Sequence, residues 1–170
     1  MRRQTPAYRQ PKEISEEEAL ARLTKLCAGA EHCSGEMLEK MSRWGIDGET
    51  QARIMEYLTE HKYIDDERYS RAFVNDKVEY CRWGRRKIEQ ALYAKGIDRD
   101  TRNAALDAIS DETFVEILRP LIAMKRKQTA ASSEYEMTTK LIRFAMSRGF
   151  TMNQIRQCID NAEEYQEDED

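Results

Sequence analysis

The sequence predicts an all-α fold of three tandem three-helix repeats, arranged as an elongated array with thin cores. Only 7 glycines and 3 prolines occur in 170 residues, which favours helices over a turn-rich β fold. Hydrophobic residues make up 40% of the chain and charged residues 35%, which suits several small cores better than one large globule. The third observation is an internal repeat, in which a glycine-containing segment recurs three times.

The repeated segment has an apolar residue four positions before a glycine, then an apolar residue and Asp or Thr. The segments are residues 41–47, 92–98 and 145–151, with glycines at Gly45, Gly96 and Gly149. A glycine after a helix adopts the left-handed conformation without a steric penalty, and the next residue folds back on the last turn. Asp or Thr then caps the following helix. Each segment predicts a tight helix–glycine–helix corner. The alternative is an irregular helical domain with coincidental glycine stops.

A further helix is predicted ahead of each pair of helices joined by a corner. The first spans about Ser15 to Ala28 and begins with a capping box formed by Ser15 and Glu18. The second begins near Asp66. The third begins near Asp111 and contains Pro120, which predicts either a kink or the true start of that helix.

These elements divide the chain into five predicted segments. The divisions are a disordered basic arm at 1–13, three-helix repeats at 14–62, 63–110 and 111–163, and an acidic tail at 164–170. Further N-caps are expected at Ser133 and, in a second capping box, at Thr151.

The formal net charge of −4 conceals an uneven distribution of charge. Residues 160–170 contain seven acidic residues and no Lys or Arg, so the rest of the chain carries a net charge of +3. Between Arg68 and Arg102, ten basic and five acidic residues give a local net charge of +5. A basic centre with an acidic tail favours a polyanionic partner or one with anionic patches. The tail itself either solubilises the chain or competes with DNA for the basic centre.

Several classes of protein are disfavoured by what the sequence lacks. Residues 1–13 contain no apolar stretch typical of a signal peptide, and no run of about 18 apolar residues occurs. We therefore expect a cytoplasmic protein with reduced cysteines and no membrane contact. Cys27, His32 and Cys33 form the only grouping of metal-ligand type, without a second pair at ligand spacing. No phosphate-binding glycine loop, nucleophile motif or catalytic carboxylate pair appears, so no metal, cofactor or enzymatic activity is expected.

The middle of the chain carries a more specific pattern. It reads Tyr63-Ile-Asp-Asp-Glu-Arg-Tyr-Ser-Arg-Ala-Phe73, then Trp83-Gly-Arg-Arg-Lys-Ile88, followed by Leu92 and Lys95-Gly-Ile97. This succession resembles the signature of the RecX family of recombinase regulators. The resemblance covers most of residues 15–163, and it is specific in the middle repeat and weak in the last. Many family members have proline at the position of Arg85, where this chain instead adds a charge at a helix start.

The resemblance implies a crescent of three three-helix repeats and a regulatory function. It implies binding to the RecA–single-stranded-DNA filament and inhibition of strand exchange, ATP hydrolysis and coprotease activity, with effects on recombination, DNA repair and the SOS response. The expected partners are the RecA filament and single-stranded DNA, with weak binding to duplex DNA, and the expected state is a monomer. The alternative is a direct helical nucleic-acid-binding protein without a recombinase partner, because such corners resemble helix-turn-helix geometry. A passive helical scaffold is the third hypothesis.

Ten basic residues are candidates for contact with the filament or with DNA phosphates. They are Arg68, Arg71, Arg82, Arg85, Arg86, Lys87, Lys95, Lys125, Arg126 and Lys127. The group at 82–87 gathers at a helix start, where positive charge opposes the helix dipole, so a binding role is favoured over a solvated face. The group at 125–127 ends a helix, where cations are locally favourable, and there a solvated face is slightly favoured. Trp83 could stack on a base or pack between repeats, and packing is favoured.

Overall fold

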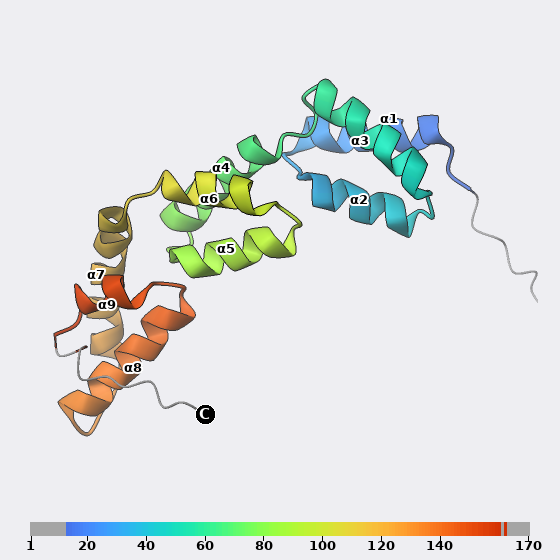
Figure 1. Cartoon of the computed structure of the whole chain (residues 1–170). Helices are drawn as coiled ribbons and strands as arrows, with labels where there is room; N and C mark the ends of the chain where they lie inside the picture. Colours follow the sequence, from blue (N-terminus) through green and yellow to red (C-terminus); the bar gives the residue numbers. More distant parts are fainter. Residues whose placement is uncertain (1–12, 161, 163–170) are drawn as a thin grey trace, which may run out of the picture. The chain divides into compact units, whose positions relative to one another are not determined.

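The structure, a computed structural model, describes residues 13–160 and residue 162. In this part of the chain the secondary structure consists of nine α-helices without a strand (Figure 1). They are α1 (Glu16–Gly29), α2 (Ser34–Arg43), α3 (Gly48–Glu60), α4 (Asp66–Glu79), α5 (Arg85–Ala94), α6 (Arg99–Asp107), α7 (Asp111–Gln128), α8 (Glu134–Ser147) and α9 (Met152–Arg156). The predicted all-α class is confirmed.

The helices pack in groups of three, as the predicted repeat requires. The first group, α1 to α3, belongs to one compact unit that ends at Asp65. Its core consists of Ala19, Leu23, Met37, Met41, Ile54, Leu58 and Ile64. A second compact unit, which begins at Asp66, contains the other two groups, α4 to α6 and α7 to α9. Its largest fully buried side chains include Phe114 and Phe150, whose rings meet edge to face with their centroids 6.5 Å apart.

The three glycine corners have the predicted geometry. The backbone φ is +75° at Gly45, +78° at Gly96 and +93° at Gly149, which is the left-handed region that favours glycine. The N–H of the residue after each glycine donates to the carbonyl five residues earlier, over 3.1 to 3.2 Å, in Ile46–Met41, Ile97–Leu92 and Phe150–Ala145. This bond closes the last turn of the preceding helix in the manner of a Schellman motif. The predicted corners are confirmed at all three positions.

The helix after each corner is capped by the predicted residue. Asp47 accepts a hydrogen bond from the Thr50 N–H at 3.0 Å, and Asp98 accepts one from the Thr101 N–H at the same distance. Thr151 forms a complete capping box with Gln154 at the start of α9. The chain therefore uses the same corner and cap in each repeat.

One local prediction needs correction, and one of two open alternatives is excluded. Ser15 caps α1 by accepting from the Glu18 N–H at 3.1 Å, but the reciprocal arm of the predicted capping box is absent. The Glu18 carboxylate instead accepts from Arg22, one turn further along the helix, at 2.6 Å. Pro120 does not mark a helix start, because α7 begins at Asp111 and continues through the proline.

The ends of the chain fall mostly outside the described residues. This applies to residues 1–12 of the predicted basic arm and to the predicted acidic tail at 164–170. In the described part of the chain, no helix combines the length and the hydropathy needed to cross a membrane.

Candidate nucleic-acid interface

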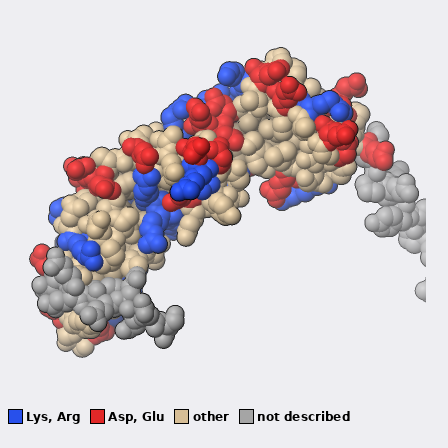
Figure 2. Space-filling model, viewed as in Figure 1, with Lys and Arg blue, Asp and Glu red and all other residues tan. Residues whose placement is uncertain are grey.

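The first turn of α5 carries three basic residues, Arg85, Arg86 and Lys87, and no acidic residue. Arg82 lies just ahead of it, with a left-handed backbone φ of +53°. Figure 2 shows Lys and Arg side chains gathered over the part of the molecule where α5 begins in Figure 1. The N-cap position is Gly84, which has no side chain to accept a capping hydrogen bond. The start of α5 therefore needs another partner for its backbone N–H groups.

The corner between α8 and α9 supplies that partner. The Gly84 N–H donates to the Arg148 carbonyl at 2.7 Å, and the Arg86 N–H donates to the Gly149 carbonyl at 3.0 Å. Carbonyl groups at the end of α8 thus satisfy N–H groups at the start of α5. The basic residues of α5 consequently lie beside the C-terminal end of α8, where positive charge is favourable. This contact offsets the unfavourable interaction of the same cations with the dipole of α5.

Trp83 contacts one lysine side chain from α4 and one from α5. The Lys77 and Lys87 ammonium groups are 4.8 and 4.5 Å from the centre of its ring, and Lys77 is also 5.2 Å from the centre of the Phe73 ring. Trp83 is half-buried in this arrangement. Each contact has the geometry of a cation–π interaction. These packing contacts hold the ring among positive charges, and stacking of a base on Trp83 stays the less favoured alternative.

The four cations at the α5 start are not equally available to a partner. Arg85 forms an ion pair with Asp107 at 2.6 Å, which ties α5 to the end of α6. Lys87 is half-buried above Trp83. Arg82 and Arg86 are exposed. These two side chains therefore present most of the available charge.

The other candidates from the second repeat lie on different parts of α4 and α5. Arg68 is half-buried on α4, and Arg71 is exposed one turn later, 3.9 Å from the Glu67 carboxylate. Lys95 is the C-cap residue that follows α5, with its ammonium group 5.9 Å from the centre of the Tyr69 ring. These three residues are therefore separate from the basic cluster at the start of α5.

The basic residues at the end of α7 are linked to α8 through an aromatic ring. The Lys125 ammonium group and the Arg148 guanidinium group lie 5.2 and 5.3 Å from the centre of the Phe144 ring. Arg148 also donates to the Cys81 carbonyl at 3.5 Å, which brings it to the segment that follows α4. Arg126 forms an exposed ion pair with Glu134 at 3.1 Å, and Lys127 is exposed.

Three cations of this surface were missed by reasoning from the sequence. Lys77 lies one helical turn after Phe73, a spacing that places both residues on one face of α4. Arg148 occupies the basic or aromatic position that precedes the corner glycine, so its place was visible although its contact with Cys81, just after α4, was not. Arg102 lies in α6, and its guanidinium group is 5.2 Å from the centre of the Tyr93 ring.

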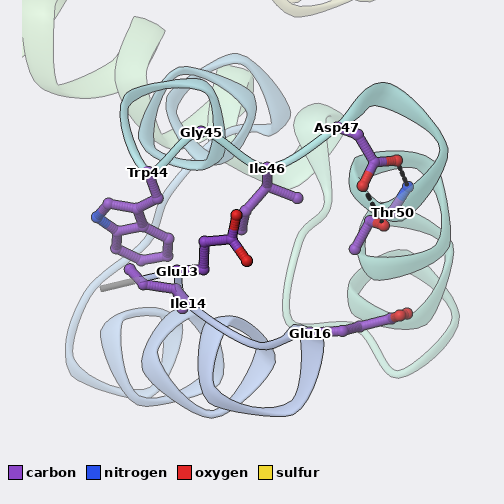
Figure 3. Close-up of a pocket in the computed structure, with 8 residues that line it drawn as sticks. All are labelled: Glu13, Ile14, Glu16, Trp44, Gly45, Ile46, Asp47 and Thr50. Atoms are coloured by element: carbon purple, nitrogen blue, oxygen red, sulfur yellow. Dashed lines mark hydrogen bonds between the residues drawn. The ribbon is translucent and has the colours of Figure 1, made fainter. Parts of the chain in front are cut away.

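A pocket beside the first corner has the opposite chemistry. Its volume is about 290 Å³, and it is lined by Glu13, Ile14, Glu16, Trp44, Gly45, Ile46, Asp47 and Thr50 (Figure 3). Two of its carboxylates already have partners, since Glu16 accepts from Arg53 at 3.0 and 3.1 Å and Asp47 caps α3. The hydrogen bond from Arg53 keeps the pKa of Glu16 below its usual value. An ionised acidic lining disfavours a phosphate-bearing ligand here.

Two family models match the chain. Residues 65–106 match the second three-helix domain of RecX, and residues 111–159 match the third. Together these matches cover more than half of the chain. Among curated relatives, Regulatory protein RecX of Herbaspirillum seropedicae is 27% identical over 142 residues, which are 84% of this chain and 89% of the relative. The protein of the same name from Clostridium tetani is 28% identical over 127 residues, and the match spans 73% of this chain but only 57% of that relative.

Solved structures agree with the sequence matches. The crystal structure of RecX from Lactobacillus salivarius has a TM-score of 0.80 at 19% identity, covering 88% of this chain and 97% of the other. A second crystal structure, of a regulatory protein RecX, has a TM-score of 0.79, covering 84% of this chain and 72% of the other. At this identity, the likeness establishes a shared fold of three-helix repeats. With the family models matched in consecutive repeats, the chain belongs to the RecX family.

Proposed function

We propose that this protein regulates recombination by binding the RecA–single-stranded-DNA filament and inhibiting its strand-exchange, ATPase and coprotease activities. One observation carries the proposal beyond family membership. The α5 start presents cations on a backbone whose Gly84 and Arg86 N–H groups donate to the α8–α9 corner. These charges are held in place without an internal acidic cap, which suits contact with phosphates or an acidic protein surface.

The backbone of Arg82 supports a binding role for this surface. A non-glycine residue at positive φ costs roughly 1–2 kcal/mol relative to ordinary backbone conformations. Lys62 is the only other non-glycine residue in the described part of the chain with this conformation, and it follows the end of α3. A charged side chain kept in such a position is consistent with selection for the charge itself.

The proposal includes the ten predicted basic contacts, the repeat boundaries at 14–62, 63–110 and 111–163, and action in the cytoplasm as a monomer. Within the contact set, we rank Arg82 and Arg86 first, because both are exposed. Arg85 and Lys87 have additional structural roles, in the ion pair with Asp107 and above Trp83.

The ATPase activity of RecA on single-stranded DNA tests this function. Titration of the wild-type protein is expected to inhibit the activity, and inhibition well below stoichiometric amounts would indicate end capping or filament disassembly. The variant Arg82→Glu/Arg86→Glu is expected to lose most of the inhibition, because charge reversal replaces attraction to the filament by repulsion. The double variant is expected to keep its helical circular-dichroism signal, since the side chains of both residues are exposed.

Arg43→Glu provides the matched control. Arg43 is an exposed residue at the end of α2, paired only with Glu39 one turn earlier among the described ion pairs, and it belongs to the first unit, whereas the proposed contact residues all belong to the second. This variant should inhibit RecA as the wild type does. Undiminished inhibition by the Arg82→Glu/Arg86→Glu variant would refute the proposed contact residues. Duplex binding without any effect of the wild type on RecA would favour a direct nucleic-acid-binding protein instead.

A further inference from the structure

A groove between α5 and α6 has a basic and aromatic lining. Its volume is about 350 Å³, and Arg86, Glu89, Gln90, Tyr93 and Arg102 line it. Tyr93 is 70% exposed, although one face of its ring is covered by the Arg102 guanidinium group at 5.2 Å. Exposed tyrosines also occur elsewhere on the chain, at Tyr80 and Tyr135, so the feature that sets Tyr93 apart is its place beside two arginines in a groove.

The same place in the first repeat shows what the fold itself requires. With the 51-residue offset between the first two corners, Ser42 and Gln51 occupy the positions of Tyr93 and Arg102. Gln51 donates to the corner carbonyl of Ile46 at 2.7 Å and to the Ser42 hydroxyl at 3.3 Å.

The second repeat keeps the side-chain hydrogen bond to the corner carbonyl but makes it with an arginine in place of the glutamine. Arg102 donates to the Ile97 carbonyl at 2.6 Å, in the manner of Gln51, and then extends over the Tyr93 ring. Arg86 stands where the first repeat has Gly35. The corner can therefore be built with Ser and Gln, and the structural role does not account for the positive charges and the aromatic ring of the second repeat.

We infer that the α5–α6 groove binds one unpaired nucleotide of single-stranded nucleic acid. The base stacks on the exposed face of Tyr93, which Arg102 supports from the other side. The Arg86 and Arg102 guanidinium groups contact the adjoining phosphates. The inference deepens the proposed function by naming a base-contacting site within the surface that meets the filament.

The lining favours a nucleotide over an acidic peptide. An acidic peptide would match the two arginines but not the exposed ring of Tyr93, which lines the same groove. Glu89 and Gln90 also line the groove, so it is not a uniform anion site. A carboxylate and an amide offer hydrogen-bond acceptors and donors to the polar edge of a base, while the phosphates stay with the arginines.

Binding to two oligonucleotides of equal length separates base stacking from phosphate contact. One is oligothymidylate of about 20 nucleotides, and the other is its fully abasic analogue, which keeps the phosphates and lacks the bases. Tyr93→Ala is expected to weaken binding to oligothymidylate about tenfold and leave binding to the abasic strand unchanged, as measured by fluorescence anisotropy. Tyr93→Phe is expected to bind both strands as the wild type does.

Two further variants complete the test. Tyr135→Ala removes a tyrosine of similar exposure, 65%, from the start of α8, outside the groove, and should leave both affinities unchanged. Arg102→Gln retains the donor that Gln51 supplies in the first repeat. It should lower the salt dependence of binding to both strands by about 0.7 in log–log slope, the amount expected for one phosphate contact.

The outcomes distinguish this inference from the proposed function. The nucleotide site is refuted if Tyr93→Ala weakens both strands equally, if it resembles Tyr135→Ala, or if the wild type does not bind single strands. Should the wild type inhibit the RecA ATPase while Tyr93→Ala binds oligothymidylate normally, the groove assignment fails and the regulatory function stands. If binding to oligothymidylate depends on Tyr93 but the wild type does not inhibit RecA, the nucleotide site stands and the regulatory function fails.

Discussion

At the scale of single residues, two glycines allow α5 and the α8–α9 corner to meet backbone to backbone. A Cβ atom on Gly84 would lie 2.3 Å from the Gly149 carbonyl carbon and 2.3 Å from the Phe150 nitrogen. A Cβ atom on Gly149 would lie 2.5 Å from the Cβ and the backbone nitrogen of Lys87. Since most of these atoms belong to backbone, rotation of a side chain cannot relieve the overlap. The two glycines thus hold the basic start of α5 against the third repeat.

The variant Gly84→Ala should destabilise the second unit. The φ angle of Gly84 is −80°, which alanine adopts without strain, so any cost arises from the close contact with the α8–α9 corner. The expected loss in free energy of unfolding is about 1–3 kcal/mol, typical of overpacking. The chain has two tryptophans, one in each unit, so Trp44→Phe leaves Trp83 to report urea unfolding of the second unit.

Gly48→Ala is the control for this substitution. Gly48 begins α3, and a Cβ atom there would meet nothing within 4 Å. Its replacement by alanine should change the free energy of unfolding of the first unit by less than about 1 kcal/mol, and we expect a small increase. Trp44 fluorescence in a Trp83→Phe background measures this change. Equal losses for Gly84→Ala and Gly48→Ala would contradict the proposed role of the interhelix contact.

At the scale of the element, α3 and α6 begin on aspartate caps that make the stability of their repeats dependent on pH. The Asp98 carboxylate accepts from both the N–H and the hydroxyl of Thr101, at 3.0 and 2.7 Å. These hydrogen bonds lower the pKa of Asp98 below its usual value of 3.8. Because the folded-state pKa is lowered, the stabilisation is fully present above the unfolded-state pKa and is lost as the pH falls through the folded-state pKa.

Asp98→Asn should therefore lower the urea midpoint of the second unit at neutral pH, because the amide accepts without a negative charge. The variant should then lose less stability than the wild type when the pH falls from about 5 to about 2. Trp83 fluorescence at a series of pH values measures both effects. Asp100→Asn makes the same charge change in the first turn of α6 without removing the cap, and it should keep the wild-type pH dependence. Parallel pH profiles for wild type and Asp98→Asn would contradict the capping account.

Elements could be predicted from the sequence because their signals are local. The bond that closes the corner at Gly96 joins residues five positions apart, and the Asp98 cap joins residues three apart. The contact of α5 with the α8–α9 corner joins Gly84 to Arg148, and no helical period or cap motif encodes such a pairing. The same limit explains why the basic cluster at the α5 start was predicted but the support of its backbone was not.

At the scale of the whole molecule, the features that favour nucleic-acid binding are concentrated in the second unit. Both family-model matches lie essentially in this unit, and so does the basic and aromatic lining of the α5–α6 groove. The first unit has the same helix–glycine–helix scaffold with a polar pair at the equivalent place. The repeats therefore share a scaffold but differ in the chemistry of their surfaces.

The charge at the C-terminal end of the sequence should oppose DNA binding by this basic surface. Residues 163–170 contain six of the seven acidic residues in 160–170, and removing them changes the formal net charge from −4 to +2. If this tail competes with DNA, its deletion should tighten binding to single strands severalfold at low salt. The gain should largely disappear above about 0.1 M salt, where the Debye length falls below about 10 Å. A full-length variant with the six acids replaced by Gln and Asn should behave as the deletion does, since charge and not length causes the effect. Unchanged affinity at low salt in both variants would leave the tail with a solubilising role only.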